Sequence, residues 1–426
     1  MISLNDELQR RLAAIREQDL YRELRRLDSP QGPRIEIAGR TLLNFSANDY
    51  LGLASHPALK EAALKAVERF GAGSGASRLV CGSLAPHHEL EEALAAFKGV
   101  EAALTFSSGY ATALGTITAL LGQDDILILD KLAHACLVDA ARLCGAKLRV
   151  FDHNDLNDLE KMLKWAHRRD ELHESPASTL KSGTRVTRPS GRKARILIVT
   201  ESVFSMDGDH APLREIAALK EKYGAWLMVD EAHATGLYGA NRRGLAEELG
   251  VSGQIEVQMG TLGKALGASG GYICGSRVLI DYLTNRARSF IFSTAPIPAA
   301  VAAATAGIQL TRSPEGERRC RTLWQRVAEC RTVVAPVSRI FGREYGDRRD
   351  PSPTPSTILP LIIGKESDAV AAATALRNQN IFVPAIRYPA VARGAARLRI
   401  TLTAAHSSED VRSLATALAE LVHPKS

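Results

Sequence analysis

The stretch AWLMVDEAHATG, residues 225–236, begins with apolar residues and becomes polar at Asp230. A short apolar run of this kind predicts a buried strand. Six further runs of the same type are separated by helical patterns, at 102–106, 125–130, 147–151, 195–200, 255–259 and 271–275. One separating segment, PLREIAALKEKYG (212–224), begins with proline and ends with glycine, as helices tend to. The alternation predicts an α/β domain around a mainly parallel sheet.

The two ends of the chain show a different pattern. Residues 1–27 are predicted to form an amphipathic helix, because apolar residues recur there near helical spacing, and a hairpin is predicted at 34–45. Beyond about residue 300, long helical patterns precede strand-like segments at 357–364 and 396–403. We therefore expect residues 1–45 to join a smaller α+β domain formed by residues 300–426, and residues 46–299 to form the large domain.

Composition limits the classes of function. The chain has 426 residues, 45% of them hydrophobic and 24% charged, which is typical of a soluble globular protein. Most of the net charge of +7 lies in one stretch, 166–194, which is rich in Ser, Thr, Gly and Pro. We expect a basic, solvated insertion there and no nucleic-acid binding, the alternative being a docking patch for an acidic partner.

Targeting signals and cysteine spacing point to the cytosol. The N-terminus lacks the apolar core of an export signal, and no apolar run reaches the roughly 20 residues of a membrane span. The six cysteines form no C-x-x-C pair, so reduced structural thiols are expected, and no metal site is predicted. The expected protein is cytoplasmic and has no membrane partner.

Polar residues follow several predicted strands. Asp230 and His233 follow one strand, His134 follows another, and Ser-Ser-Gly at 107–109 leads from a strand into a helix whose start could bind a phosphate. Lys264 lies in TLGKALGASGG, among small residues that we interpret as leaving room for a flat ring. Ligands of open α/β sheets bind at the carboxyl ends of strands. An amine for a Schiff base and an acid for a pyridine nitrogen together predict a pyridoxal 5′-phosphate site.

Each of these features alone is weak. An Asp-x-x-His pair is more often structural than catalytic, and His134 alone is more typical of a helix start. Their order along one α/β chain favours the joint interpretation.

Longer stretches carry a family resemblance: NFSANDYLGL (44–53), GAGSGASRLVCG (71–82), HND (153–155), TESVFSMDGDHAPL (200–213) and AIRYPAVARGAARLRITLTAAH (385–406). With the motifs above, the chain resembles the α-oxoamine synthases, pyridoxal phosphate enzymes of fold type I, whose fold is aspartate aminotransferase-like. Within them it looks most like the acyltransferases of biotin biosynthesis, which condense L-alanine with a pimeloyl thioester, on coenzyme A or acyl carrier protein. Only the insertion at 166–194 lies outside the resemblance.

The resemblance implies a role for each matching residue. Lys264 would bind the cofactor aldehyde and move the substrate α-proton, Asp230 would pair with the pyridinium nitrogen, and His134 would stack on the ring. Further cofactor contacts would come from Gly109, Tyr110, Glu201, Ser205, His233, Thr261 and Thr294. Thr294 would belong to a second subunit, which implies a homodimer with shared active sites. Asn48 and Arg399 would bind the amino-acid substrate; on sequence alone, Arg399 is an ordinary strand-edge arginine.

Two other functions stay open. A 2-amino-3-ketobutyrate ligase, which joins glycine to an acetyl thioester, belongs to the same family, and substrate assays would separate the two. A catalytically silent protein on the same fold is less consistent with a chain that keeps Lys264, Asp230, His134 and His233 together. One departure from the family is Cys81, where relatives usually have serine.

Overall fold

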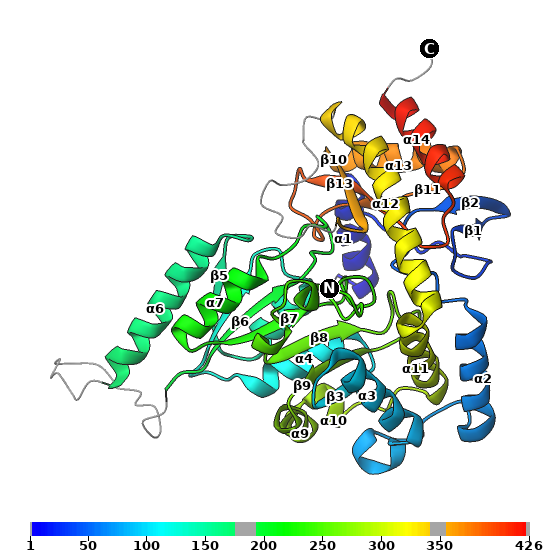
Figure 1. The fold of residues 1–426 in the computed structure, drawn as a ribbon. Helices are drawn as coiled ribbons and strands as arrows, with labels where there is room; N and C mark the ends of the chain where they lie inside the picture. The colour runs from blue at the N-terminus through cyan, green and yellow to red at the C-terminus, as the bar shows by residue number, and fades with distance from the viewer. Residues whose placement is uncertain (1, 175–192, 341–354, 423–426) are drawn as a thin grey trace.

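The structure, a computed structural model, describes residues 2–174, 193–340 and 355–422. At its centre is a seven-stranded sheet in the order β3-β9-β8-β7-β6-β4-β5 (Figure 1). The strands are β3 (Ala102–Phe106), β4 (Ile126–Asp130), β5 (Lys147–Phe151), β6 (Ile196–Glu201), β7 (Trp226–Asp230), β8 (Val257–Thr261) and β9 (Gly271–Gly275). Every neighbouring pair is parallel except the two that include β9. The predicted α/β fold with a mainly parallel sheet is confirmed, and each predicted strand is correct to within two residues.

Helices cover both faces of the sheet because side chains alternate along each strand. Ile126 and Ile128 of β4 face a core that includes α6 and α7, whereas Leu127 and Leu129 face a core that includes α4, α5, α9 and α10. These helices are α4 (Gly109–Leu120), α5 (Ala135–Leu143), α6 (Leu156–Glu174), α7 (Leu213–Tyr223), α9 (Arg277–Arg286) and α10 (Arg288–Ile291). At the β3 edge, a third core brings in α3 (Ala85–Lys98) and α11 (Pro298–Arg312), and α2 (Pro57–Phe70) packs on α11.

The two chain ends lie side by side, as Figure 1 shows for the blue hairpin and the orange and red elements. The predicted hairpin is formed by β1 (Arg34–Ile37) and β2 (Arg40–Asn44), and β2 pairs with β11 (Ile381–Phe382). A second small sheet has the order β10-β13-β12. Its strands and the surrounding helices are β10 (Ile358–Gly364), β12 (Ala385–Ile386), β13 (Ala396–Thr401), α12 (Pro314–Ile340), α13 (Glu366–Asn378) and α14 (Ser408–Val422). The exact domain boundaries stay a prediction.

Two predictions about helical structure are corrected. The N-terminal helix α1 is Leu4–Glu17, shorter than the predicted 1–27, because the chain turns at Asp19, whose φ is 55°. Its apolar side chains are exposed by 38–73%: Leu4, Leu8, Leu12 and Ile15. Helix α6 continues to Glu174, into the stretch predicted as an insertion, and residues 175–192 of that stretch lie outside the described residues.

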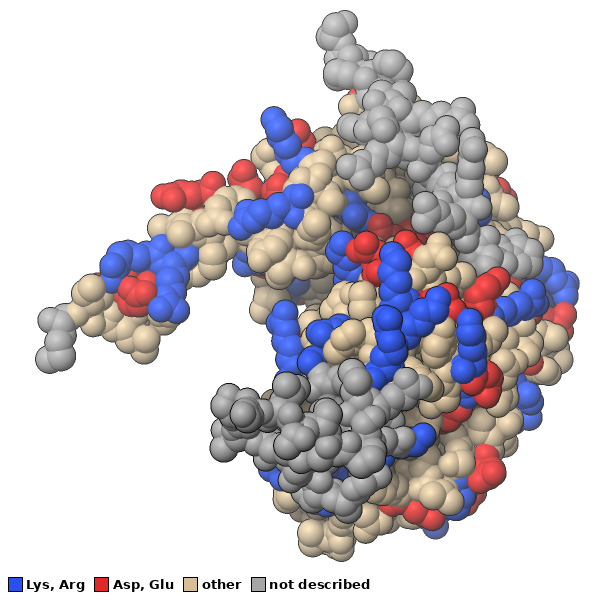
Figure 2. Space-filling view, turned by 90° about the vertical axis from the view of Figure 1, so that its left-hand side faces the viewer, with Lys and Arg blue, Asp and Glu red and all other residues tan. Residues whose placement is uncertain are grey.

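The remaining elements are α8 (Leu245–Glu248), η1 (Arg78–Gly82) and η2 (Ser252–Gln254). All six cysteines are free thiols, and only Cys81 is exposed. Within the described ranges, none of the helices has the length and apolar character needed to cross a membrane. On the face shown in Figure 2, basic and acidic side chains are interspersed.

Candidate active site

Two buried carboxylates lie side by side at the carboxyl ends of β6 and β7. Glu201 is paired in register with Asp230, and these side chains belong to residues that are 2% and 5% exposed. Burial raises the pKa of both acids. The charge of Asp230 raises the pKa of Glu201 further, whereas the charge of Lys264 lowers the pKa of Asp230 and so offsets part of the effect of burial. This edge of the sheet therefore favours cationic partners.

Lys264 meets these acids from the loop between β8 and β9. Its Nζ lies 2.7 Å from Nε2 of His233. Burial lowers the pKa of Lys264 to about 8, although Asp230 and Glu201 counteract the shift. An amine with this pKa is partly neutral near pH 7 to 8, which suits a group that accepts and returns protons.

His233 connects Lys264 to a residue that sequence reasoning missed. Its Nδ1 lies 2.6 Å from the hydroxyl of Tyr50, which is fully buried. Burial, and then the positive charges of Lys264 and Arg399, hold the pKa of His233 well below its ordinary value. The imidazole is therefore neutral. The motif NFSANDYLGL contains Tyr50, but nothing in its spacing indicates a contact with position 233.

His134 caps the start of α5 and is hydrogen-bonded to one of these acids. Its backbone N–H donates to Oε1 of Glu201 at 2.6 Å, and its Nδ1 accepts from the backbone N–H of Cys136 at 3.3 Å. Burial lowers the pKa of His134, while Asp230 opposes the shift. The residue as a whole is exposed, so the imidazole lies at the open side of the site.

The residues predicted to bind the phosphate lie at the start of α4 and at the end of β8. The Oγ of Ser108 caps α4 by accepting from the N–H of Ala111 at 3.1 Å, while the first amides of the helix, Gly109 and Tyr110, lack helical carbonyl partners. Gly271 pairs in register with Thr261, and a Cβ at Gly271 would lie 2.8 Å from the nitrogen of Gly109. The glycine therefore lets the end of β8 and the start of α4 lie close together.

Arg399 connects two other predicted residues, Ser205 and Asn48, from distant parts of the chain. Its Nε donates to the backbone oxygen of Ser205 at 2.6 Å, and its Nη1 donates to Oδ1 of Asn48 at 3.1 Å. Arg397, which the sequence did not indicate, points to the same loop and donates to Oδ1 of Asp207 at 2.5 Å. Strand β13 thus holds the loop after β6 with two buried arginines.

Thr294 lies apart from this group. It is exposed and forms an isolated β-bridge with Ser77. Among the described residues, no recorded hydrogen bond links Thr294 to Lys264 or Gly109. Its predicted role in the site of a second subunit stays a prediction.

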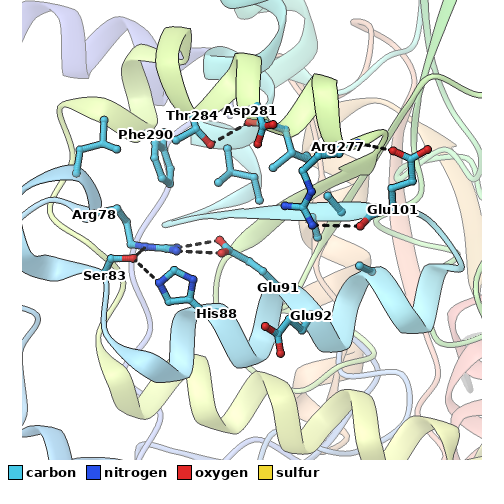
Figure 3. A pocket seen from close by; sticks show the side chains of 16 residues that line it. Arg78, Ser83, His88, Glu91, Glu92, Glu101, Arg277, Asp281, Thr284 and Phe290 are labelled. Carbon is cyan, nitrogen blue, oxygen red and sulfur yellow. Dashed lines mark hydrogen bonds and ion pairs between the residues drawn. The ribbon is translucent and has the colours of Figure 1, made fainter.

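A separate cavity of about 520 Å³ lies beside α3 (Figure 3). Arg78 points to Glu91 and donates to both carboxylate oxygens, at 2.8 and 2.9 Å, and Arg277 binds the backbone oxygen of Glu101 at 3.4 Å. Both arginines that line the cavity therefore have protein partners. Neither in this cavity nor in the rest of the described ranges could a group of three or more His, Cys, Asp or Glu residues hold a metal ion.

Comparisons with known proteins agree with this geometry. The family described as Aminotransferase class I and II matches residues 40–418. An 8-amino-7-oxononanoate synthase of Geobacter sulfurreducens is 44% identical over 410 residues, covering 96% of both chains. A second, from Anaeromyxobacter sp. strain Fw109-5, is 47% identical over 417 residues, covering 98% of this chain and 96% of that one.

The chain belongs to the 8-amino-7-oxononanoate synthases, within the class I and II aminotransferase family. Solved structures agree on the fold. A serine palmitoyltransferase of S. paucimobilis with a bound PLP–myriocin adduct has a TM-score of 0.83 and 27% identity, covering 98% of this chain and 96% of that one.

The residues of this site fit pyridoxal 5′-phosphate. Asp230 Oδ1 accepts from the N–H of Ala232 at 2.9 Å, and within the described chain no hydrogen bond is recorded for Oδ2, which leaves an acceptor for a pyridinium N–H. Lys264 provides an amine of lowered pKa, and the start of α4 provides amide donors for a phosphate. The site could therefore hold the ring, the aldehyde and the phosphate of the cofactor.

Proposed function

We propose that this chain catalyses the pyridoxal 5′-phosphate-dependent condensation of L-alanine with a pimeloyl thioester, which gives 8-amino-7-oxononanoate, carbon dioxide and the free thiol. The observation that carries the proposal is the position of Lys264. Its amine is 2.7 Å from a neutral His233 and beside the buried acids Asp230 and Glu201, in a chain 44% identical to a synthase of this name.

Different side chains of the site have different roles in the reaction. When bound, pyridoxal 5′-phosphate supplies an aldehyde that reacts with amines and a ring that accepts electrons. Lys264 Nζ takes up the α-proton of alanine and later returns one, which a pKa of about 8 permits in both directions. Asp230 would hold the proton on the pyridine nitrogen, and His134 would lie against the ring. Gly109, Tyr110 and Thr261 would bind the phosphate.

Arg399 and Asn48 orient the amino acid. A guanidinium can bind a carboxylate through two parallel hydrogen bonds, which fixes the plane of the substrate. The bonds from Arg399 to Ser205 and Asn48 hold this side chain in one orientation before the substrate arrives. Alanine is thereby presented with its α-hydrogen toward Lys264.

A homodimer with shared active sites forms part of the proposal. Large apolar side chains within three residues of Ser77 or Thr294 in the sequence are exposed, as a partner surface requires. They are Leu79, Val80, Phe292 and Ile297, exposed by 49–78%. A second uncovered apolar surface is the face of α1.

Subunit mixing tests the shared site. If Thr294 acts on the Lys264 of its partner, a mixture of Lys264→Ala and Thr294→Ala chains contains hybrids with one intact site, and activity returns. If Thr294 acts on its own chain, each hybrid site carries one substitution and activity stays low. Light scattering of the purified protein gives the number of subunits independently.

Substrate assays test the reaction itself. The purified protein loaded with cofactor is given L-alanine with pimeloyl-coenzyme A, L-alanine with pimeloyl-acyl carrier protein, or glycine with acetyl-coenzyme A. We expect 8-amino-7-oxononanoate by mass spectrometry and a much higher kcat/KM with alanine and one of the pimeloyl thioesters. A clear preference for glycine and acetyl-coenzyme A would overturn the proposal in favour of a 2-amino-3-ketobutyrate ligase.

A further inference from the structure

The motif HND (153–155) follows β5, and none of its residues is a predicted site residue. Asp155 holds the start of α6, because its Oδ1 accepts from the backbone N–H of Asn157 at 2.9 Å. Asn154 has a φ of 55° and donates its backbone N–H to Oδ2 of Asp130 at 3.1 Å. These contacts fix the backbone on the C-terminal side of the histidine.

His153 links the end of β4 to the loop that follows β6. Its Nδ1 lies 2.9 Å from Oδ1 of Asp130, the last residue of β4, and its Nε2 lies 2.7 Å from Oδ2 of Asp209 in the loop. An ionised carboxylate only accepts, so both ring nitrogens donate and the imidazole is a cation. The side-chain amide of Asn154 donates to the same oxygen of Asp209 at 3.2 Å, as a neutral second donor.

The loop after β6 is closed at the residue that His153 contacts. The N–H of Phe204 donates to the backbone oxygen of Asp209 at 3.0 Å, and the N–H of Gly208 donates to the backbone oxygen of Phe204 at 2.9 Å. The ring of Phe204 also packs edge-on against His153, with the centroids 4.4 Å apart. The contacts of His153 therefore hold Phe204 and the residue next to it, Ser205.

Ser205 connects this loop to Arg399. Its backbone oxygen accepts from Nε of Arg399 at 2.6 Å. Because this bond uses Nε, the terminal nitrogens of the guanidinium can bind a carboxylate while the bond persists. A Cβ at Gly208 would overlap the backbone oxygen of Ile358 in β10, the neighbour of β13, so the loop packs directly against the sheet that contains Arg399.

We propose that His153 is a positioning residue for the amino-acid substrate. As a cation between Asp130 and Asp209, it holds the loop after β6 against the end of β4, and Ser205 of that loop sets the orientation of the Arg399 guanidinium. The inference rests on the proposed function for the role of Arg399 in binding the substrate carboxylate. The two acids and the histidine are not predicted cofactor contacts, so the link does not compete with the cofactor.

His153→Asn removes the link on one side. Nδ2 of asparagine can take the place of the imidazole Nδ1 and donate to Asp130, whereas nothing replaces Nε2. Asp209 then keeps the neutral amide of Asn154 but loses its charged donor, the stronger of the two. We expect the Kd for L-alanine to rise by about tenfold or more, because a displacement of about 1 Å in a positioning group has effects of this size. The affinity for pyridoxal 5′-phosphate should not change.

Arg195→Gln is the matched control. Arg195 binds Asp125 through Nε at 3.0 Å and Nη2 at 2.6 Å, and these residues directly precede β6 and β4. The pair thus joins the starts of the two strands whose opposite ends are linked through His153. Both variants lose a partly buried contact between a cation and a carboxylate. A general loss of stability would appear in both, whereas weaker alanine binding should appear only in His153→Asn.

Two measurements test the proposal. Titration of the cofactor-loaded full chain with L-alanine, without thioester, gives the Kd from the change in cofactor absorbance. Hydrogen exchange of the cofactor-free full chain, followed by mass spectrometry of the peptide 201–212, gives the opening of the loop after β6. We expect weaker alanine binding and faster exchange in His153→Asn, and wild-type values of both in Arg195→Gln.

Unchanged alanine binding in folded His153→Asn would overturn the inference, because faster exchange alone would show only a structural role. Weaker binding with unchanged exchange would overturn it too, since the loop would not carry the effect. An equal loss of affinity for the cofactor, or an equal effect in Arg195→Gln, would also contradict it. If His153→Asn fails to fold, Asp209→Ala removes the same hydrogen bond from the loop side, and unchanged alanine binding in that variant would overturn the inference.

Failure of the proposed function gives a different result. A wild-type protein that binds glycine but not alanine would overturn the proposed substrate alone. Both amino acids present the same carboxylate, so the variants would then be compared with glycine. A wild-type protein that binds neither would overturn the proposed function and the inference together.

Discussion

The buried ion pair between Lys98 and Glu231 supports the strand end that carries Asp230. Both side chains are 1% exposed, and Lys98 Nζ lies 2.5 Å from Glu231 Oε2 and from the backbone oxygen of Arg243. Glu231 Oε1 accepts from the N–H of Ala246 at 2.8 Å. We predict that replacing either member alone destabilises the chain strongly and that replacing both costs much less.

The magnitude follows from burial. Lys98→Met keeps the length of the side chain but leaves a carboxylate without its cation, and breaking a buried pair in this way costs about 3–5 kcal/mol. Glu231→Gln leaves the ammonium unpaired and should cost a similar amount. The double variant leaves no buried charge at positions 98 and 231, and the glutamine oxygen can still accept from the N–H of Ala246. A total cost of about 1–2 kcal/mol is therefore expected, typical of ordinary core substitutions.

Urea unfolding followed by tryptophan fluorescence gives the free energy of unfolding for the wild type, both single variants and the double variant. The two single losses should sum to about 6–10 kcal/mol, so the double-variant cycle should show a coupling of at least about 4 kcal/mol. A cost below about 1 kcal/mol for Lys98→Met would refute the reasoning, because that is the value of an exposed pair. A double variant as unstable as the summed singles would refute it equally.

Three further outcomes are expected. Lys264→Ala should abolish turnover but still bind pyridoxal 5′-phosphate through the phosphate site, as equilibrium dialysis would show; turnover near the wild-type rate would contradict the role of the amine. Arg399→Lys should raise KM for alanine by about tenfold or more, with KM for the thioester unchanged, because a bidentate carboxylate contact is lost; equal changes in both constants would argue against it. Burial lowers the pKa of His153, but hydrogen bonds to Asp130 and Asp209 outweigh it and raise the pKa to about 10. The stabilising effect of His153 is therefore complete below its unfolded pKa of about 6.5 and is lost as pH rises toward 10. The difference in unfolding free energy between wild type and His153→Asn should shrink across that range. A difference that stays constant with pH would contradict this prediction.

The sequence predicted the sheet and the residues at its edge because both leave local patterns. An apolar run ends where a strand leaves the core, so Asp230 marks the end of β7 directly, whereas Glu201 at the end of β6 was expected only from the family resemblance. Strands that run parallel bring such ends to one edge. The predicted cofactor residues of the large-domain loops, such as Lys264, are therefore close together without any long-range information.

Contacts between buried polar groups leave no such pattern. Tyr50 and His233 are 183 residues apart, and Lys98 and Glu231 are 133 residues apart. Periodicity indicates that a position is buried but not which group it contacts across the core. The apolar stripe of α1 is a similar case, because the pattern indicates one apolar face without indicating what contacts it, and no residue of α1 is buried in this chain.

The small residues around Lys264 show how one pattern can have a different cause from the one inferred. The sequence suggested that they leave room for a ring. In the structure, a Cβ at Gly267 would lie 2.5 Å from Leu53 Cβ, and one at Gly271 would lie 2.8 Å from the Gly109 nitrogen. Only at Gly263 would the nearest atom be as far as 3.6 Å. Most of these glycines are therefore needed because other segments of the protein pack directly against the loop and leave no space for a Cβ. This close packing fixes the position of the loop, so Lys264 stays aligned with His233 and Asp230.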